Sequence, residues 1–82
     1  AQPQQHERPK DSDEVLNVLS PRECDIFSAI VRGLTNAEIS DELVLAPSTI
    51  KSHINSIFAK LNLRDRVHAV ILGYELGLTG DR

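Results

Sequence analysis

The sequence predicts an all-α domain with four helices, at about residues 21–33, 36–44, 47–62 and 66–76. Two observations predict this fold. Apolar residues recur at spacings of three and four in these segments, which is the period of a helix face. Capping residues, prolines and glycines stand where such helices would begin and end. We expect residues 15–80 to form the domain. Residues 1–14 are expected to be a flexible linker or tail, because they are mostly polar.

The first helix has a clear start signal. Ser20 can accept a hydrogen bond from the N–H of Glu23, and the Glu23 carboxylate can reach back to the N–H of Ser20. Pro21 suits the first helical position, where its missing N–H costs nothing, and Gly33 suits the helix end. The apolar residues form one stripe that should face the core: Ile26, Phe27, Ile30, Val31 and Leu34.

The second and third helices are separated by a short bend. Thr35 and Glu38 repeat the start signal of the first helix, and apolar residues follow one turn apart. Residues 44–46 break this period before Pro47, which disfavours helix at the preceding residue and suits the first turn of a new helix. Two helices that meet across about three residues predict a helix-turn-helix motif.

The third helix has two different sides. One side is apolar and should pack on the core: Ile50, Ile54, Ile57, Phe58 and Leu61. The other side is polar and has no evident packing role: Ser48, Lys51, Ser52, Asn55, Lys60 and Asn62. His53 lies between the two sides, where a packing role is favoured over a functional one. We therefore expect the polar side to be the functional surface.

The last helix is apolar on two sides. Asp65 is suited to cap its start, and Gly77 is suited to close it. One stripe consists of Val67, Val70, Ile71 and Tyr74, and the other consists of Ala69, Leu72 and Leu76. Such a helix needs two partners. One should be the core, and we expect the other to be a second copy of the chain.

The charge is unevenly distributed along the chain. The formal net charge is −3, which by itself disfavours a nucleic-acid partner. However, residues 21–45 carry a net −3, whereas residues 46–68 carry a net +3. The positive segment coincides with the third helix, and a local basic surface favours nucleic-acid binding more than the total charge opposes it. Ordinary scatter of charges is the alternative.

The composition argues against several classes of function. A single cysteine excludes an intrachain disulfide and a multi-thiolate zinc site, and it favours a reducing, cytoplasmic location. No apolar run approaches the length of about 18 residues that could span a membrane. We find no nucleophile–base set, phosphate-binding glycine loop or group of metal ligands. We therefore expect neither an enzyme nor a cofactor or metal site.

Four segments together resemble the LuxR/NarL (GerE-type) DNA-binding domain of bacterial response regulators. They are LSPRE at 19–23, GLTNAEIS at 33–40, STIKSHINSIFAKLNL at 48–63 and RDRVHAV at 64–70. The resemblance covers about residues 18–78, in the order and spacing of the family. It implies four helices, with the third in the major groove of double-stranded DNA, and a receiver or sensor domain on the N-terminal side.

The resemblance also implies roles for individual residues. Base contacts are expected from Lys51, Ser52 and Asn55, and phosphate contacts from Thr49, Lys60 and Arg66. Apart from the resemblance, we also expect phosphate contacts from Ser48 and Arg64, which lie close to these residues in the sequence. The dimer interface is expected at Val67, Val70, Ile71 and Tyr74. Lysine can donate to guanine and asparagine can pair with adenine in the major groove. Many relatives have Ser at the position of Ala46, so the third helix lacks a side-chain cap here, at a cost of about 1 kcal/mol.

Several alternatives remain open from the sequence. Lys51 and Asn55 are also ordinary surface residues, and Thr49 could serve only as a local cap. The cations at 60, 64 and 66 divide between phosphate contacts and internal pairing with Glu23 or Asp65. At the level of function, the alternative is a module that resembles sigma-factor region four, or an adaptor, whose main partner is a protein.

Overall fold

The computed structural model describes residues 12–78, which form five helices and no strand within that range. These are α1 (Ser12–Asn17), α2 (Pro21–Val31), α3 (Asn36–Leu43), α4 (Pro47–Leu61) and α5 (Arg66–Glu75). The four predicted helices are therefore confirmed. Each begins at the predicted residue and ends one or two residues earlier than predicted. No helix in the described part of the chain has both the length and the apolar character needed to cross a membrane.

The fifth helix, α1, was not predicted. Residues 12–14, predicted to belong to the linker, lie in α1; residues 1–11 lie outside the described range. A six-residue helix has too few internal hydrogen bonds to be stable alone. Val15 and Leu16 pack against the core, and this tertiary contact, which periodicity does not reveal, stabilises the helix.

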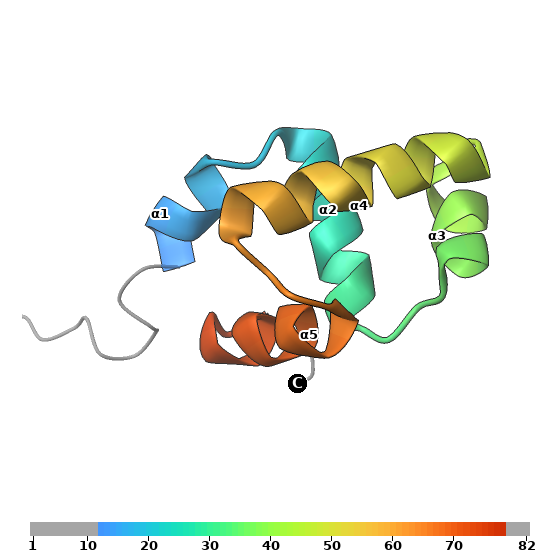
Figure 1. The fold of residues 1–82 in the computed structure, drawn as a ribbon. Helices are drawn as coiled ribbons and strands as arrows, with labels where there is room; N and C mark the ends of the chain where they lie inside the picture. The colour runs from blue at the N-terminus through green and yellow to red at the C-terminus, as the bar shows by residue number, and fades with distance from the viewer. Residues whose placement is uncertain (1–11, 79–82) are drawn as a thin grey trace, which may run out of the picture.

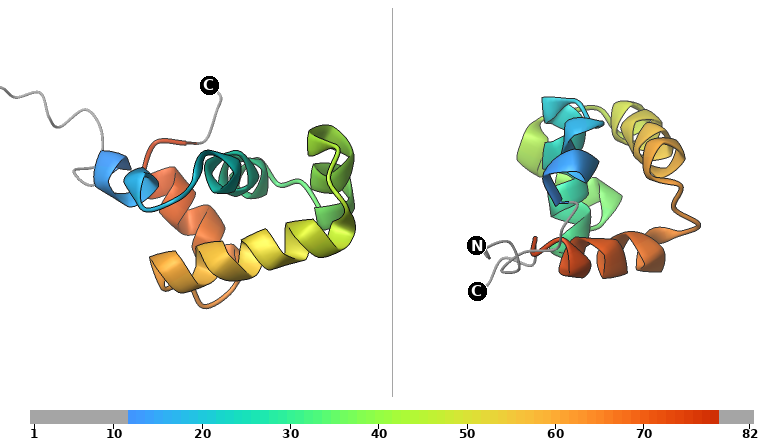
Figure 2. Two further views of the ribbon diagram at one scale, coloured as in Figure 1. Left: turned by 90° about the horizontal axis from the view of Figure 1, so that it is seen from above. Right: turned by 90° about the vertical axis from the view of Figure 1, so that its left-hand side faces the viewer.

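The helices surround α2. α4 and α5 both pack against α2, and α3 packs against α2 and α4. In Figure 1, α4 crosses above α5, and α1 and α3 lie at opposite ends of the domain. The view from above in Figure 2 shows α3 meeting the start of α4 at one end. Six large side chains, all but fully buried, fill the space between the helices: Ile26, Phe27, Ile30, Ile39, Ile50 and Ile57.

The predicted caps are present. The Ser20 hydroxyl accepts from the N–H of Glu23 at 3.1 Å, and the Glu23 carboxylate accepts from the N–H of Ser20 at 2.8 Å. Thr35 and Glu38 form the same reciprocal pair at the start of α3. The Asp65 carboxylate caps α5. As expected, α4 starts at Ala46–Pro47 without a side-chain cap. Local sequence therefore sets where each of these helices begins.

The bend between α3 and α4 is built around Val44. This residue has φ 56° and ψ 52°, in the left-handed region, and its side chain is 86% exposed. The N–H of Leu45 donates to the carbonyl of Ser40 at 3.1 Å, and the Ser40 hydroxyl donates back to the carbonyl of Leu45. Ser40 therefore closes the turn with two hydrogen bonds, one through its backbone and one through its side chain.

The inward side of α5 lies unusually close to α2. Ala69, Gly73 and Leu76 are buried there. A Cβ atom added to Gly73 would lie 2.2 Å from Cγ2 of Val31, so no larger residue fits without movement. The close approach fixes α5 on the end of α2 and leaves its other side facing solvent.

Candidate nucleic-acid interface

The outward face of α4 consists of Ser48, Lys51, Ser52 and Asn55, all of which are exposed. They are exposed because Ile50, Ile54 and Ile57, on the opposite side of the helix, are buried in the core. The structure therefore brings together the three residues predicted to contact bases and one of those predicted to contact phosphate.

The side chains on this outward face make no hydrogen bond or ion pair with any residue between 12 and 78. Their donors and acceptors are turned towards solvent, with the ammonium group of Lys51 as the cation among them. Thr49, also predicted to contact phosphate, is partly buried beside them. Lysine and asparagine side chains of this kind match the acceptors and donors that base pairs present in a major groove.

The start of α4 adds a partial positive charge to the same end of the helix. Pro47 has no N–H, and Ala46 provides no side-chain acceptor for the N–H groups of the first turn. The helix dipole and such N–H groups favour an anion at a helix start. Ser48 and Thr49, for which phosphate contacts are predicted, lie in this turn.

Lys60 has an internal partner. Its ammonium group donates to Oε1 of Glu23 at 2.7 Å, and the hydroxyl of Ser56 donates to Oε2 of the same carboxylate at 2.7 Å. Glu23 is only 5% exposed. The hydrogen bond from Lys60, followed by those from the Ser20 N–H and Ser56, lowers the pKa of Glu23 to about 2. The internal pairing with Glu23 that the sequence left open is therefore confirmed.

Arg66 also has internal partners, although they are neither Glu23 nor Asp65, the two partners predicted for the cations. Its guanidinium donates from Nη1 to Oδ1 of Asn36 at 2.7 Å and from Nη2 to the carbonyl of Leu34 at 2.6 Å. These bonds connect the first residue of α5 to the loop before α3 and to the first residue of α3. The guanidinium of Arg64, in contrast, is exposed and makes no hydrogen bond with the described residues.

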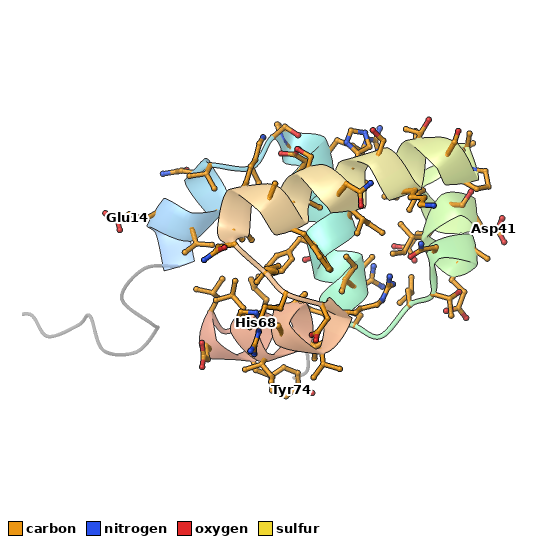
Figure 3. The ribbon with its side chains drawn as sticks, in the orientation of Figure 1. Glu14, Asp41, His68 and Tyr74 are labelled. Carbon is orange, nitrogen blue, oxygen red and sulfur yellow. The ribbon has the colours of Figure 1, made fainter. Side chains whose placement is uncertain are left out.

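The outward face of α5 is apolar. Val67, Ile71 and Tyr74 are 67%, 51% and 63% exposed, and Figure 3 shows Tyr74 pointing away from the other helices. Val70, the fourth residue predicted in the dimer interface, is partly buried against the core. Three of the four predicted interface residues therefore form one exposed surface.

His53 and Cys24 do not belong to the outward faces. His53 is partly buried, as its position between the two sides of α4 predicted. The thiol of Cys24 donates to the carbonyl of Leu16 at 3.6 Å, and burial raises its pKa. A raised pKa keeps a thiol protonated and unreactive.

The fold and the outward face together define a class of protein. A short bend joins α3 to α4, α4 presents polar side chains that have no partner within residues 12–78, and the other helices bury its apolar side. This is a helix-turn-helix domain. The family model described as "Bacterial regulatory proteins, luxR family" matches residues 17–72. The chain belongs to this family.

Relatives in the family are longer proteins. The chain is 40% identical over 67 residues to the transcriptional regulatory protein ComA of Bacillus subtilis (strain 168), covering 82% of the chain and 31% of ComA. It is 38% identical over 60 residues to the nitrate/nitrite response regulator protein NarP of Escherichia coli (strain K12), covering 73% of the chain and 28% of NarP. The chain therefore spans about a third of the length of these relatives, and it is homologous to the DNA-binding domain of such regulators.

Two features of this region were missed in the sequence. Glu23 was predicted as a capping residue and as one of two possible partners for the cations, but the hydrogen bond that Ser56 donates to it was not predicted. The spacing of Ser56 and Lys60 carried a signal for this shared bond, because the two residues are four positions apart and so lie on one side of the helix. The link from Arg66 to Asn36 had no comparable signal, since 30 residues separate the two.

Proposed function

We propose that this domain binds double-stranded DNA in a sequence-specific manner, with α4 in the major groove. The observation that carries the proposal is the outward face of α4, which is exposed and makes no hydrogen bond or ion pair with the described residues, on a helix that is buried along its other side. Membership of a family of bacterial regulatory proteins supports it. In this proposal Lys51, Ser52 and Asn55 contact bases.

The contacts to phosphate are proposed for the residues that flank this face. Ser48 and Thr49 lie at the start of α4, where N–H groups lack a side-chain cap. Arg64 follows α4 and has an exposed guanidinium. Lys60 and Arg66 were predicted for the same role, but in the free domain both donate to protein acceptors. Phosphate contact by these two residues would have to coexist with those bonds or replace them.

The proposal is tested by titrating the protein with a duplex selected from random sequence and following amide chemical shifts. We expect shifts at residues 48–55, and an affinity that falls linearly in log units with log salt concentration. Lys51→Ala should weaken specific binding by about 1–3 kcal/mol without changing the melting temperature. Arg32→Ala is the matched control, because Arg32 is an exposed cation paired with Glu42.

Absence of shifts in residues 48–55 with every duplex would refute the proposal. It would favour the alternative of a module that binds mainly protein. Shifts confined to α5 would lead to the same conclusion.

We also propose that the outward face of α5 forms a homodimer on DNA. Val67, Ile71 and Tyr74 give it exposed apolar area, but the area is small, so self-association should be weak without DNA. A duplex with two half-sites should strengthen it. Ile71→Asp should abolish cooperative binding to such a duplex and leave binding to one half-site unchanged. Ile71 is a better probe than Val70, whose partial burial would add a folding defect.

In the full-length protein, we propose that this domain is the output domain of a two-component response regulator in the bacterial cytoplasm, preceded by a receiver or sensor domain. The support is the relatives' names and the third of their length that the chain matches. The full-length gene tests this directly. A receiver domain with a phosphorylatable Asp is the expected result, and its absence would contradict the response-regulator assignment.

A further inference from the structure

Glu23 connects the start of α2 to the second half of α4. Its carboxylate accepts from the Ser20 N–H at the helix cap, from the hydroxyl of Ser56 and from the ammonium group of Lys60. All three donor distances are 2.7–2.8 Å. Two of the three donors lie one turn apart on α4. One buried carboxylate therefore holds α4 at two points.

The burial of Glu23 makes it unfavourable for Lys60 to leave this bond. Glu23 is only 5% exposed, and a buried carboxylate without a cationic partner is strongly destabilising. If the Lys60 ammonium moved to a DNA phosphate, the Glu23 carboxylate would lose its only ion-pair partner among the described residues. Its negative charge would also remain close to the DNA. Both effects oppose transfer of Lys60 to phosphate.

The two-point contact determines how α4 is oriented. Bonds to Ser56 and Lys60 resist rotation of α4 about its axis and sliding along α2, because hydrogen bonds are directional. Buried isoleucines alone would tolerate small movements better. Asn55 adjoins Ser56, and Lys51 lies one turn further towards the start of the same helix. Any rotation of α4 would therefore displace the side chains that face the proposed DNA.

We propose that Glu23 and Lys60 form a positioning pair for the outward face of α4, and that Lys60 makes no phosphate contact. This rests on the proposed DNA binding. It assigns a role in recognition to Glu23, a residue of α2 that faces the protein interior. It also leaves two cations in α4 and the loop after it, Lys51 and Arg64, that are available to DNA because their side chains have no partner among the described residues.

One variant, Glu23→Gln, has opposite expected effects on DNA affinity under the two roles for Lys60. If the pair positions α4, Glu23→Gln and Lys60→Met should each lower the affinity for the specific duplex by about tenfold, comparable to losing part of one base contact. If Lys60 instead contacts phosphate and Glu23 competes for it, Glu23→Gln should raise the affinity. The direction of the Glu23→Gln effect therefore decides between them.

The salt dependence provides a second measurement. A lysine that neutralises one phosphate contributes about 0.9 to the slope of log affinity against log salt. We expect Lys60→Met to leave this slope unchanged. Arg64→Met, the matched variant of a cation whose side chain has no partner in the part of the chain that the structure describes, should reduce it by about 1. A reduced slope for Lys60→Met would overturn the proposal.

Four measurements distinguish a loss of positioning from a general loss of stability. Lys60→Arg keeps a donor for Glu23 and should restore most of the specific affinity. The double variant Glu23→Gln/Lys60→Met should be no weaker than either single variant, since both remove the same contact. Specific affinity should fall more than non-specific affinity, and the amide shifts of residues 51–55 should change in the free domain. Equal loss of both affinities would show that the pair is only structural.

The outcomes also separate this inference from the proposed function. Wild-type protein that binds no duplex would refute the function. Wild-type protein that binds DNA, with a Lys60→Met variant of unchanged affinity, would refute only the positioning role. If Glu23→Gln does not fold, the comparison of Lys60→Met with Lys60→Arg and Arg64→Met still decides the question.

Discussion

α4 and α5 both pack on α2, but α2 holds them by different means at its two ends. Near its start, Glu23 binds α4 through an ion pair and a hydroxyl hydrogen bond. At its end, Val31 meets the bare backbone of Gly73 in α5. The first contact is polar and directional, whereas the second depends only on shape.

This difference corresponds to the surfaces that the two helices present. α4 exposes polar side chains whose direction matters for the base recognition proposed above, and its contact with Glu23 fixes direction. α5 exposes Val67, Ile71 and Tyr74, and an apolar contact with a partner is much less directional. α4, whose side chains need a defined direction, is therefore held to α2 by the more directional contact. Four predictions test this comparison, from the largest expected effect to the smallest.

The packing of the apolar side of α4 on the core should still contribute more to the free energy of unfolding than its polar contacts do. Ile57→Ala removes a side chain that is 0% exposed and should lower the free energy of unfolding by about 2–5 kcal/mol. Asn55→Ala, two residues away on the outward face, should change it by less than about 0.5 kcal/mol. Urea denaturation followed by circular dichroism measures both. Similar losses for the two variants would contradict the assigned faces.

The polar attachment of α4 should be sensitive to acid. The pKa of Glu23 is about 2 in the fold against an ordinary value of 4.5. The folded state therefore binds fewer protons, and the stabilisation is present above pH 4.5 and lost as the pH falls towards 2. The free energy of unfolding of the wild type should exceed that of Glu23→Gln by about 2 kcal/mol at neutral pH. This difference should shrink as the pH falls from 4.5 towards 2. A difference independent of pH would show that the charge of Glu23 contributes nothing.

The attachment of α5 should be sensitive to size instead. Gly73→Ala places a Cβ atom 2.2 Å from Cγ2 of Val31 and should cost about 1–3 kcal/mol through overpacking. Adding Val31→Ala makes room for the methyl group. Thermal unfolding of the single and double variants measures the interaction between the two sites, and purely additive losses would argue against a direct clash.

The smallest effect concerns the start of α4. Ala46→Ser introduces a hydroxyl that can accept from the N–H of Thr49 and should raise the free energy of unfolding by about 1 kcal/mol. Ala59→Ser, an exposed substitution inside the same helix, is the control and should give no gain. Thermal unfolding of both variants checks this. Stabilisation by both variants would show that the cap is not responsible.

The fold was predictable because the helix starts are encoded locally. Ser20, Thr35 and Asp65 each cap a helix at the predicted residue, and the hydrogen bonds involved span only three residues. α1 was not predictable in the same way, since its six residues depend on contacts with the core. The exposed face of α4 also followed from periodicity alone.

The sequence could not choose between the two roles of its cations. Lys60 and Arg66 were compatible with phosphate contact or with an internal partner, and that choice depends on residues 37 and 30 positions away. Such distances along the chain become contacts only when the helices are placed relative to one another. The close approach of Gly73 to Val31 depends on the same placement. The base and phosphate contacts themselves remain predictions.

The turn at Val44 has a consequence for how this domain tolerates change. A branched side chain in the left-handed region is strained, and at 86% exposure it gains almost nothing from packing in return. The neighbouring hydrogen bonds between Ser40 and Leu45 impose the conformation. Replacement of Val44 by Gly or Asn, which adopt it more readily, would relieve strain away from the outward face of α4. Such a replacement would raise the free energy of unfolding, and the domain could then tolerate destabilising substitutions in its core that would otherwise unfold it.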